Sequence, residues 1–174
     1  DPIGSRGLGD VYKRQAENPP WSGGFTWTKS QDGYPWVGVS CQANGSYLWY
    51  PSKEHPSDEP EGADIHITVT KPLSVASNGV LQKVTDLKNK WHTWHWKTNY
   101  NINPYNINFT VGNFEIVERI IPSLEKPLKT QFFVLGENRE GADKLLDHAE
   151  IYIDFFTRSF GQYPWLKEKL GKST

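Results

Sequence analysis

This 174-residue sequence has no methionine, only one cysteine, and no apolar run near the roughly 20 residues of a membrane-spanning helix. The lone Cys41 cannot form a disulfide within the chain, so cysteine use indicates no cellular compartment. Because translation starts at methionine and this sequence starts at Asp1, we expect a fragment or a processed piece of a longer protein. Localisation stays open between the cytoplasm and the periplasm or secretion, and we predict no membrane span in this fragment.

An excess of positive charge is also missing. The formal net charge is −1, so the sequence offers no basic surface for nucleic acid, and we predict no nucleic-acid partner. Aromatic residues are abundant, with 8 Trp, 8 Tyr and 8 Phe. This composition is typical of a globular protein, and the length suffices for one domain and part of a second.

The first fifteen residues, DPIGSRGLGDVYKRQ, differ in character from the rest of the chain and contain one aromatic residue, Tyr12. They resemble the translated sequencing-adaptor read-through found at the ends of metagenomic genes. The alternative is a natural polar linker. We interpret 1–15 as a non-native leader and leave it out of the fold prediction.

Residues 24–135 show the alternation that is typical of β-strands. In ADIHITVT, for example, Ile65, Ile67 and Val69 share one face, and the polar residues between them share the other. Strands are expected at 25–28, 35–41, 63–70, 80–87, 90–98, 107–112, 114–121 and 128–136. Short strands at this regular spacing, without alternating helices, predict an all-β sandwich or open barrel.

Turn signals separate several of these strands. Asp32-Gly33 and Lys88-Asn89 are expected to close hairpins, and Ser77-Asn78-Gly79 is expected to form a turn in which Gly79 takes positive φ.

A different pattern begins near residue 138, where NREGADKLLDHAEIYIDFFTRSFG predicts an amphipathic helix that ends at Gly161. Its apolar stripe at helical spacing consists of Ala142, Leu145, Leu146, Ala149, Ile153, Phe156 and Phe160. A long helix after an all-β region indicates a second domain that is just beginning, so the stripe needs a partner surface.

Histidines are the first candidates for metal ligands, but their spacing argues against a shared site. His92 and His95 are three residues apart on one predicted strand and therefore point to opposite faces. His66 faces away from the apolar side of its strand, and His148 has no second histidine at the spacing of an H-E-x-x-H helix. We predict no metal ligand and no catalytic residue in this fragment.

The loop YPSKEHPSDEP, residues 50–60, looks like a metal or acid/base cluster because it holds one histidine and three carboxylates. Its three prolines fix the backbone and remove hydrogen-bond donors, which is typical of a rigid connection. A functional site would need a convergent partner that the spacing does not name. We therefore interpret this loop as a connector.

The longer segment CQANGSYLWYPSKEHPSDEPEGADIHITVTKPLSVASNG resembles the N-terminal β-domain signature of zinc aminopeptidases of the aminopeptidase N type, the membrane alanyl aminopeptidase family of gluzincins. The family's elements occur in order: Gln42, Tyr50-Pro51, Asp58-Glu59-Pro60, the alternating strand, and Ser77-Asn78. GGFTW, HWKTNYNINPYNINFTVGNF and YIDFFTRSFGQYPW are also similar to it, so the resemblance covers about residues 20–170. Ser52 departs from the family, which often has cysteine there.

The resemblance implies an antiparallel, saddle-like β-sandwich domain at 16–138, incomplete at its start, followed at 139–174 by the first helix of a truncated, α-helical, thermolysin-like catalytic domain. It also implies a zinc cofactor in the full-length parent, held by H-E-x-x-H and a distant glutamate. None of that set occurs here, so we expect the fragment to bind no zinc and to be inactive alone.

The partners that the resemblance implies are the missing catalytic domain of the same chain and the amino terminus of a peptide substrate. Gln42 matches the Gln or Glu that the family's β-domain places near that amino group, and is the one substrate-binding residue we predict. An amide oxygen can accept a hydrogen bond from an ammonium group without burying another charge.

Two other functions remain open. One is a carbohydrate- or protein-binding β-sandwich module, for which tryptophans would supply stacking platforms. Against this function, Trp91, Trp94 and Trp96 cannot all share one face of their strand. Trp94 and Trp96 lie on one face and Trp91 on the other, so we expect at least one of these faces to belong to the core. The other is a paralogue that keeps the β-domain without zinc. A downstream H-E-x-x-H motif would decide between the peptidase and both alternatives.

Overall fold

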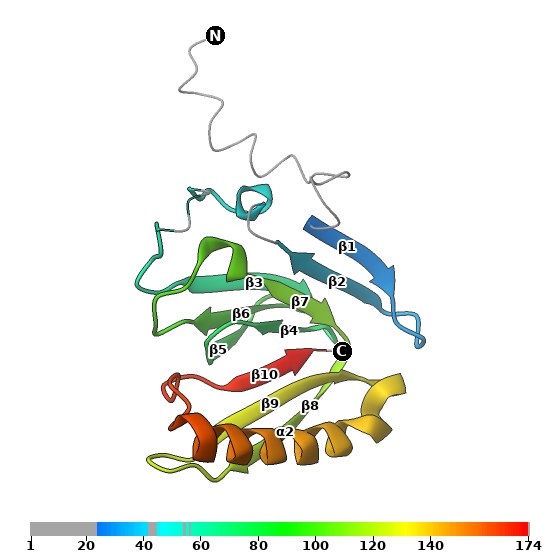
Figure 1. Cartoon of the computed structure of the whole chain (residues 1–174). Helices are drawn as coiled ribbons and strands as arrows, with labels where there is room; N and C mark the ends of the chain where they lie inside the picture. Colours follow the sequence, from blue (N-terminus) through cyan, green and yellow to red (C-terminus); the bar gives the residue numbers. More distant parts are fainter. Residues whose placement is uncertain (1–23, 42–44, 54, 56, 174) are drawn as a thin grey trace.

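The computed structural model describes residues 24–173 except 42–44, 54 and 56 (Figure 1). The predicted leader 1–15 and the predicted substrate-binding residue Gln42 therefore lie outside the described residues. In the described part, ten strands and one long helix form three small sheets with the helix on the outer side of one of them (Figure 1). The predicted fold class, mostly β with antiparallel sheets and one helix, is confirmed.

Each sheet has its own strand order. The first sheet has the order β1 (Gly24–Lys29), β2 (Pro35–Ser40), β7 (Phe109–Gly112), β4 (Ser74–Ser77). The second has the order β3 (Asp64–Thr70), β6 (Trp91–Lys97), β5 (Val80–Asp86). The third has the order β10 (Leu170–Ser173), β9 (Leu128–Leu135), β8 (Phe114–Ile121). Short 3₁₀ turns lie at η2 (Ser46–Leu48), η3 (Pro104–Asn106) and η4 (Gly136–Asn138), and α2 spans Arg139–Phe160.

Turn chemistry explains how the hairpins close. Gly33 has φ 83° between the antiparallel strands β1 and β2, as the Asp-Gly signal predicts. Between β5 and β6 the two left-handed residues are Asn89 (φ 60°) and Lys90 (φ 64°). Two successive positive φ angles define a type I′ turn, whose twist matches the flanking strands. The turn is therefore centred one residue later than the predicted Lys88-Asn89.

Two strands, β4 and β10, were not expected. β10 contains Gly171 and Lys172 and has no apolar alternation, so no local signal marks it as a strand. It pairs in parallel with β9, and α2 connects the two strands, so β9, α2 and β10 form a βαβ unit. The sequence pattern, read as strands without alternating helices, did not reveal this unit. The domain division at 138/139 stays a prediction, and strands from both sides of it share this sheet.

The main core lies where the inner faces of the three sheets meet. In β6, His92, Trp94 and Trp96 point inward and Trp91 points to solvent, which confirms the predicted division of the tryptophans. Trp96 is completely buried and packs edge-on against Phe133 of β9, with ring centroids 5.8 Å apart. The buried members are Val37, Val39, Ile65, Val69, Leu73, Val75, Trp94, Trp96, Ile107, Phe109, Val111 and Phe133.

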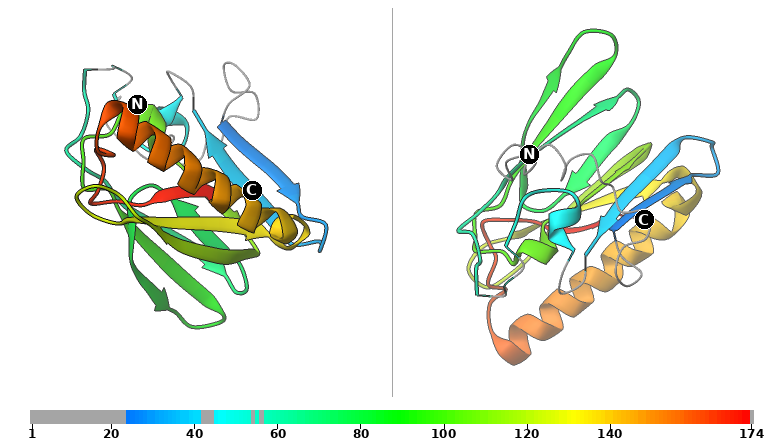
Figure 2. Two further views of the ribbon diagram at one scale, coloured as in Figure 1. Left: turned by 60° about the horizontal axis from the view of Figure 1, so that its bottom comes forward. Right: turned by 90° about the horizontal axis from the view of Figure 1, so that it is seen from above.

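The helix α2 packs one of its faces on the outer face of the third sheet (Figure 2). Ala142 and Leu146 contact Phe132 and Val134, and Ile153 contacts the start of β9. The predicted stripe is therefore partly correct. Its other members Leu145, Phe156 and Phe160 are exposed, because the small sheet is too narrow to cover the whole apolar surface of a 22-residue helix. Within the described residues, no helix has the combined length and apolar character that a membrane crossing requires.

Candidate functional site

The loop that first suggested a site, residues 50–60, makes local contacts in its described part. His55 Nδ1 lies 2.6 Å from Ser57 Oγ, and the amide of Asp58 donates to the carbonyl of His55. Lys53 Nζ lies 3.4 Å from the Asp58 carboxylate, and both side chains are exposed. These contacts fold the middle of the loop on itself, while both of its ends are bonded to the segment around η3: the Tyr50 hydroxyl donates to the carbonyl of Pro104, and the amide of Ile102 donates to the carbonyl of Pro60. The contacts of the described residues agree with the interpretation as a connector.

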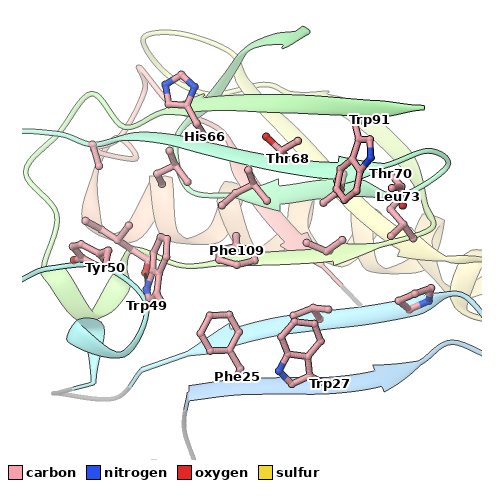
Figure 3. Close-up of a pocket in the computed structure, with 18 of the residues that line it drawn as sticks. Phe25, Trp27, Trp49, Tyr50, His66, Thr68, Thr70, Leu73, Trp91 and Phe109 are labelled. Atoms are coloured by element: carbon pink, nitrogen blue, oxygen red, sulfur yellow. Dashed lines mark hydrogen bonds between the residues drawn. The ribbon is translucent and has the colours of Figure 1, made fainter. Parts of the chain in front are cut away.

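A cleft of about 850 Å³ lies between β3 and the first sheet (Figure 3). In the described part of the chain β3 is an edge strand, and its edge faces strands β1, β2 and β7 across the cleft. An edge strand presents backbone N–H and C=O groups that can pair with an added segment. The walls are largely apolar and aromatic, and the aromatic members are Phe25, Trp27, Trp49, Tyr50, Trp91 and Phe109.

Hydrogen bonds fix the aromatic residues at one end of this cleft. The Trp49 indole N–H donates to the carbonyl of Ile107 at 3.2 Å, and the Tyr50 hydroxyl donates to the carbonyl of Pro104 at 2.9 Å. These bonds attach η2 and its following residues to η3 and so shape that end of the cleft (Figure 3). Trp27 and Trp91 are exposed, which leaves their rings open to a ligand.

Asp64 and His66, which line the cleft, form a polar group with His95 of β6. Antiparallel pairing of β3 with β6 places His66 directly opposite His95, and the two imidazole rings stack 4.0 Å apart with an interplanar angle of 14°. Asp64 precedes His66 by two residues and therefore shares its face. Its Oδ1 lies 2.6 Å from His95 Nε2.

This hydrogen bond from His95 is the main cause of a lowered pKa at Asp64, and the nearby Lys97 ammonium lowers that pKa further. The carboxylate is therefore ionised at neutral pH and available as an acceptor. Both Asp64 and His66 are exposed, and His95 is partly buried.

Sequence reasoning found part of this arrangement. It correctly placed His92 and His95 on opposite faces: His92 is buried, and its Nε2 lies 2.7 Å from the carbonyl oxygen of Leu73. It also correctly placed His66 on the solvent side of β3. It missed the meeting of His66 with His95 because that depends on the register between two strands distant in sequence. The alternating Asp-x-His of β3 was the one available signal.

Comparisons with known proteins bear on the fold. An M1 zinc metallopeptidase from Deinococcus radiodurans matches with a TM-score of 0.69 and 15% identity, over 92% of this chain and 35% of its own. A two-domain M1 zinc metallopeptidase variant bound to L-arginine matches with a TM-score of 0.67 and 16% identity, over 90% of this chain and 35% of its own. A variant bound to L-tryptophan gives a TM-score of 0.67 at 16% identity, over 92% of this chain and 36% of its own. The fold of this chain is similar to that of about a third of each of these M1 zinc metallopeptidase chains.

This M1-type fold agrees with the sequence resemblance at the level of the M1 fold and does not extend to the aminopeptidase N type. No protein-family model matches the chain, and no curated protein matches it. The chain spans about a third of the length of the structures it matches. The comparison therefore shows the fold of this chain alone.

Proposed function

We propose that this chain is an N-terminal fragment of a zinc-dependent aminopeptidase of the aminopeptidase N type, which removes N-terminal residues from peptides, and that the fragment comprises the β-domain and the beginning of the catalytic domain. The observation that carries the proposal is the M1-type fold over 90–92% of the chain. The ordered set from Gln42 to Ser77-Asn78 supports it independently, because it is a feature of sequence and not of shape.

The residues of this sequence do not fit the catalytic zinc of such an enzyme. That zinc requires H-E-x-x-H and a further glutamate, and the sequence contains no H-E-x-x-H. We therefore derive no catalytic step through zinc here. The 174-residue chain alone is expected to show no peptidase activity, and the parent protein is expected to hold zinc through residues outside this sequence.

The exposed face of α2 supports the proposed partner, the missing part of the catalytic domain of the same protein. Tyr152, Phe155, Phe156 and Phe160 are all more than half exposed on this helix, with Phe160 at 80%. Large aromatic residues grouped on one surface usually mark an interface. The missing part of the catalytic domain, packed against this face of α2, would bury them.

Gln42 remains the proposed substrate-binding residue, with its amide oxygen accepting a hydrogen bond from the substrate's ammonium group. In the parent enzyme, Gln42→Ala should raise KM for aminoacyl substrates more than it lowers kcat, because the lost contact is made in the ground state as well as in the transition state. Steady-state kinetics on aminoacyl-p-nitroanilides measure both constants. An unchanged KM would remove Gln42 from the site.

The proposal as a whole is tested by the reading frame that contains this chain. The frame should encode H-E-x-x-H beyond Thr174, and the expressed parent should release the N-terminal residue from short peptides and lose this activity with a chelator. A parent that lacks the motif and the activity would overturn the proposal and favour the non-catalytic paralogue.

A specific observation favours a second candidate, a carbohydrate- or protein-binding module. The cleft beside β3 exposes Trp27 and Trp91 in an apolar wall, and such rings can stack on sugars or pack against a peptide. Titration of the 174-residue chain with a glycan panel, followed by tryptophan fluorescence, tests this candidate. A saturable signal that disappears in Trp27→Ala would support it.

A further inference from the structure

The cluster on β3 and β6 has the chemistry of a metal site. Asp64, His66 and His95 each offer one ligand atom, and these three atoms all lie within 4.8 Å of one another. Neighbouring backbone segments hold them, since β3 and β6 are paired along their whole length from Asp64–Lys97 to Thr70–Trp91. The three side chains therefore do not depend on a loop for their relative position.

We propose that Asp64, His66 and His95 bind one divalent transition-metal ion, of which Zn²⁺ is the representative. Two imidazole nitrogens and one carboxylate oxygen form a set that suits Zn²⁺, Cu²⁺ and Ni²⁺ and does not suit Mg²⁺ or Ca²⁺, which prefer oxygen alone. This proposal does not depend on the proposed peptidase function.

The distances allow the ion to be held by small side-chain movements. Ligand atoms about 2.0–2.1 Å from a tetrahedral ion are about 3.3 Å apart. Asp64 and His95 already approach within 2.6 Å, and all three atoms need to adjust by rotation of exposed or partly exposed side chains. The ion would replace the proton shared by Asp64 and His95, and would separate the stacked rings of His66 and His95.

One competing contact must give way. Lys97 Nζ lies 3.8 Å from Asp64 Oδ2, on the strand directly opposite. That lysine is about half exposed, so its flexible chain can move to solvent when a cation occupies the site. On the other side, the hydroxyl groups of Thr68 and Thr93 hydrogen-bond each other at 2.8 Å.

The position of the site gives it a use. Three protein ligands leave a fourth position on a tetrahedral ion, which water or a ligand group can fill. Asp64 and His66 are among the residues that line the cleft and His95 is not, and the His66 ring points away from Phe25, Trp49 and Phe109 (Figure 3). Because Asp64 and His66 are exposed, the fourth position would be open to water or to a polar ligand group at the solvent-facing side of β3 and β6.

The test is calorimetric titration of the 174-residue chain with Zn²⁺ alone, in a buffer that does not bind metal. Wild-type protein should bind one ion per chain at this site. His66→Ala and His95→Ala should each weaken binding by at least about 10- to 100-fold, because even the loss of an outer partner of a ligand costs that much. His148→Ala, which removes an exposed histidine on α2, is the matched control and should bind as wild type.

A spectroscopic measurement separates loss of the site from loss of the fold. With Cu²⁺ as the probe, electron paramagnetic resonance of the wild type should show coupling to two imidazole nitrogens. Circular dichroism of each variant should match the wild type. Equal Zn²⁺ affinity in wild type, His66→Ala and His95→Ala would overturn the proposal, as would a copper spectrum with no nitrogen coupling.

Discussion

Gly79 shows how one residue can be required by both its backbone angle and its surroundings. It has φ 76° in the turn between β4 and β5, and an added Cβ would overlap the carbonyl of Lys97 and lie 2.6 Å from the amide nitrogen of Thr98. Gly33 has a similar φ of 83°, but nothing lies within 4 Å of its added Cβ. Substitutions at the two glycines therefore distinguish the free-energy cost of a positive φ angle from the cost of the steric overlap of an added Cβ.

We predict that Gly33→Ala lowers the free energy of unfolding by about 1–2 kcal/mol, the usual cost of left-handed backbone for a residue with a Cβ. Gly79→Ala should cost clearly more, because β5 must also move away from β6. Urea unfolding of both variants at one temperature measures the difference. Equal losses of unfolding free energy in the two variants would mean that the turn at Gly79 relaxes and that the overlap with the Lys97 carbonyl does not destabilise the fold.

Lys169 is an unusual charged residue because its ammonium group is enclosed where β10 begins. Nζ donates to the carbonyls of Ser77 and Gly79 at 2.9 and 2.8 Å, and it lies 4.4 Å from the centre of the Trp96 ring. Burial lowers the pKa of Lys169 from 10.5 to about 8, although nearby Glu168 opposes this shift. The contacts hold the charge in place but do not replace its lost hydration.

This lowered pKa predicts stability that rises with pH. Between pH 8 and about 10 the unfolded chain keeps a proton on Lys169 that the folded chain has released, so the free energy of unfolding increases with pH. The gain should be on the order of 1–3 kcal/mol. Above that window the raised pKa of Tyr163, caused mainly by burial, acts in the opposite direction. Urea unfolding at pH 7 and pH 9.5 should show the rise in wild type.

The neutral variant Lys169→Met is the control for this slope. It carries no titrating group at that position, so its unfolding free energy should change little between the two pH values. A slope that persists in Lys169→Met would assign the pH dependence to other groups.

At the scale of elements, α2 offers a matched pair of leucines. Leu146 is 1% exposed and packs against β9, whereas its neighbour Leu145 is 37% exposed. We predict that Leu146→Ala costs about 2–5 kcal/mol through lost burial and the cavity left behind. Leu145→Ala should cost less than about 1 kcal/mol, because this exposed side chain loses little burial. Both variants change helix propensity equally, so the difference between them reports burial alone. Chemical unfolding followed by circular dichroism compares them, and similar losses would contradict the observed packing of α2.

The elements that the sequence predicted correctly are those whose signals lie within a few neighbouring residues. The β1–β2 and β5–β6 hairpins were predicted because Asp-Gly and Lys-Asn turns join strands that are adjacent in sequence. The helix was predicted to within one or two residues because Gly161, at φ 94°, ends it. β10 was missed because Leu170–Ser173 becomes a strand only by pairing with β9, which no local pattern encodes.

At the scale of the whole molecule, the candidate site depends on pairings between distant segments. The contact of His66 with His95 follows from the register of β3 on β6, and the cleft follows from the separation of β3 from the first sheet. Alternation determined which face of β3 each residue occupies, but no residue pattern determined which histidine of β6 lies opposite His66. Gln42 stays a prediction, because it lies outside the described residues.

The exposed aromatic face of α2 yields a prediction about the whole chain. Phe156 and Phe160 form a contiguous pair, with ring centroids 5.9 Å apart, on the exposed face of the helix. If this surface is an interface, the 174-residue chain should bind a hydrophobic dye and self-associate, and Phe156→Ser with Phe160→Ser should reduce both. The same double change in the proposed parent enzyme should lower its thermal stability, because there the two rings would be buried. Dye fluorescence and sedimentation test the first expectation, and thermal unfolding of the parent tests the second. A parent that tolerates both serines without loss of stability would show that the catalytic domain packs elsewhere.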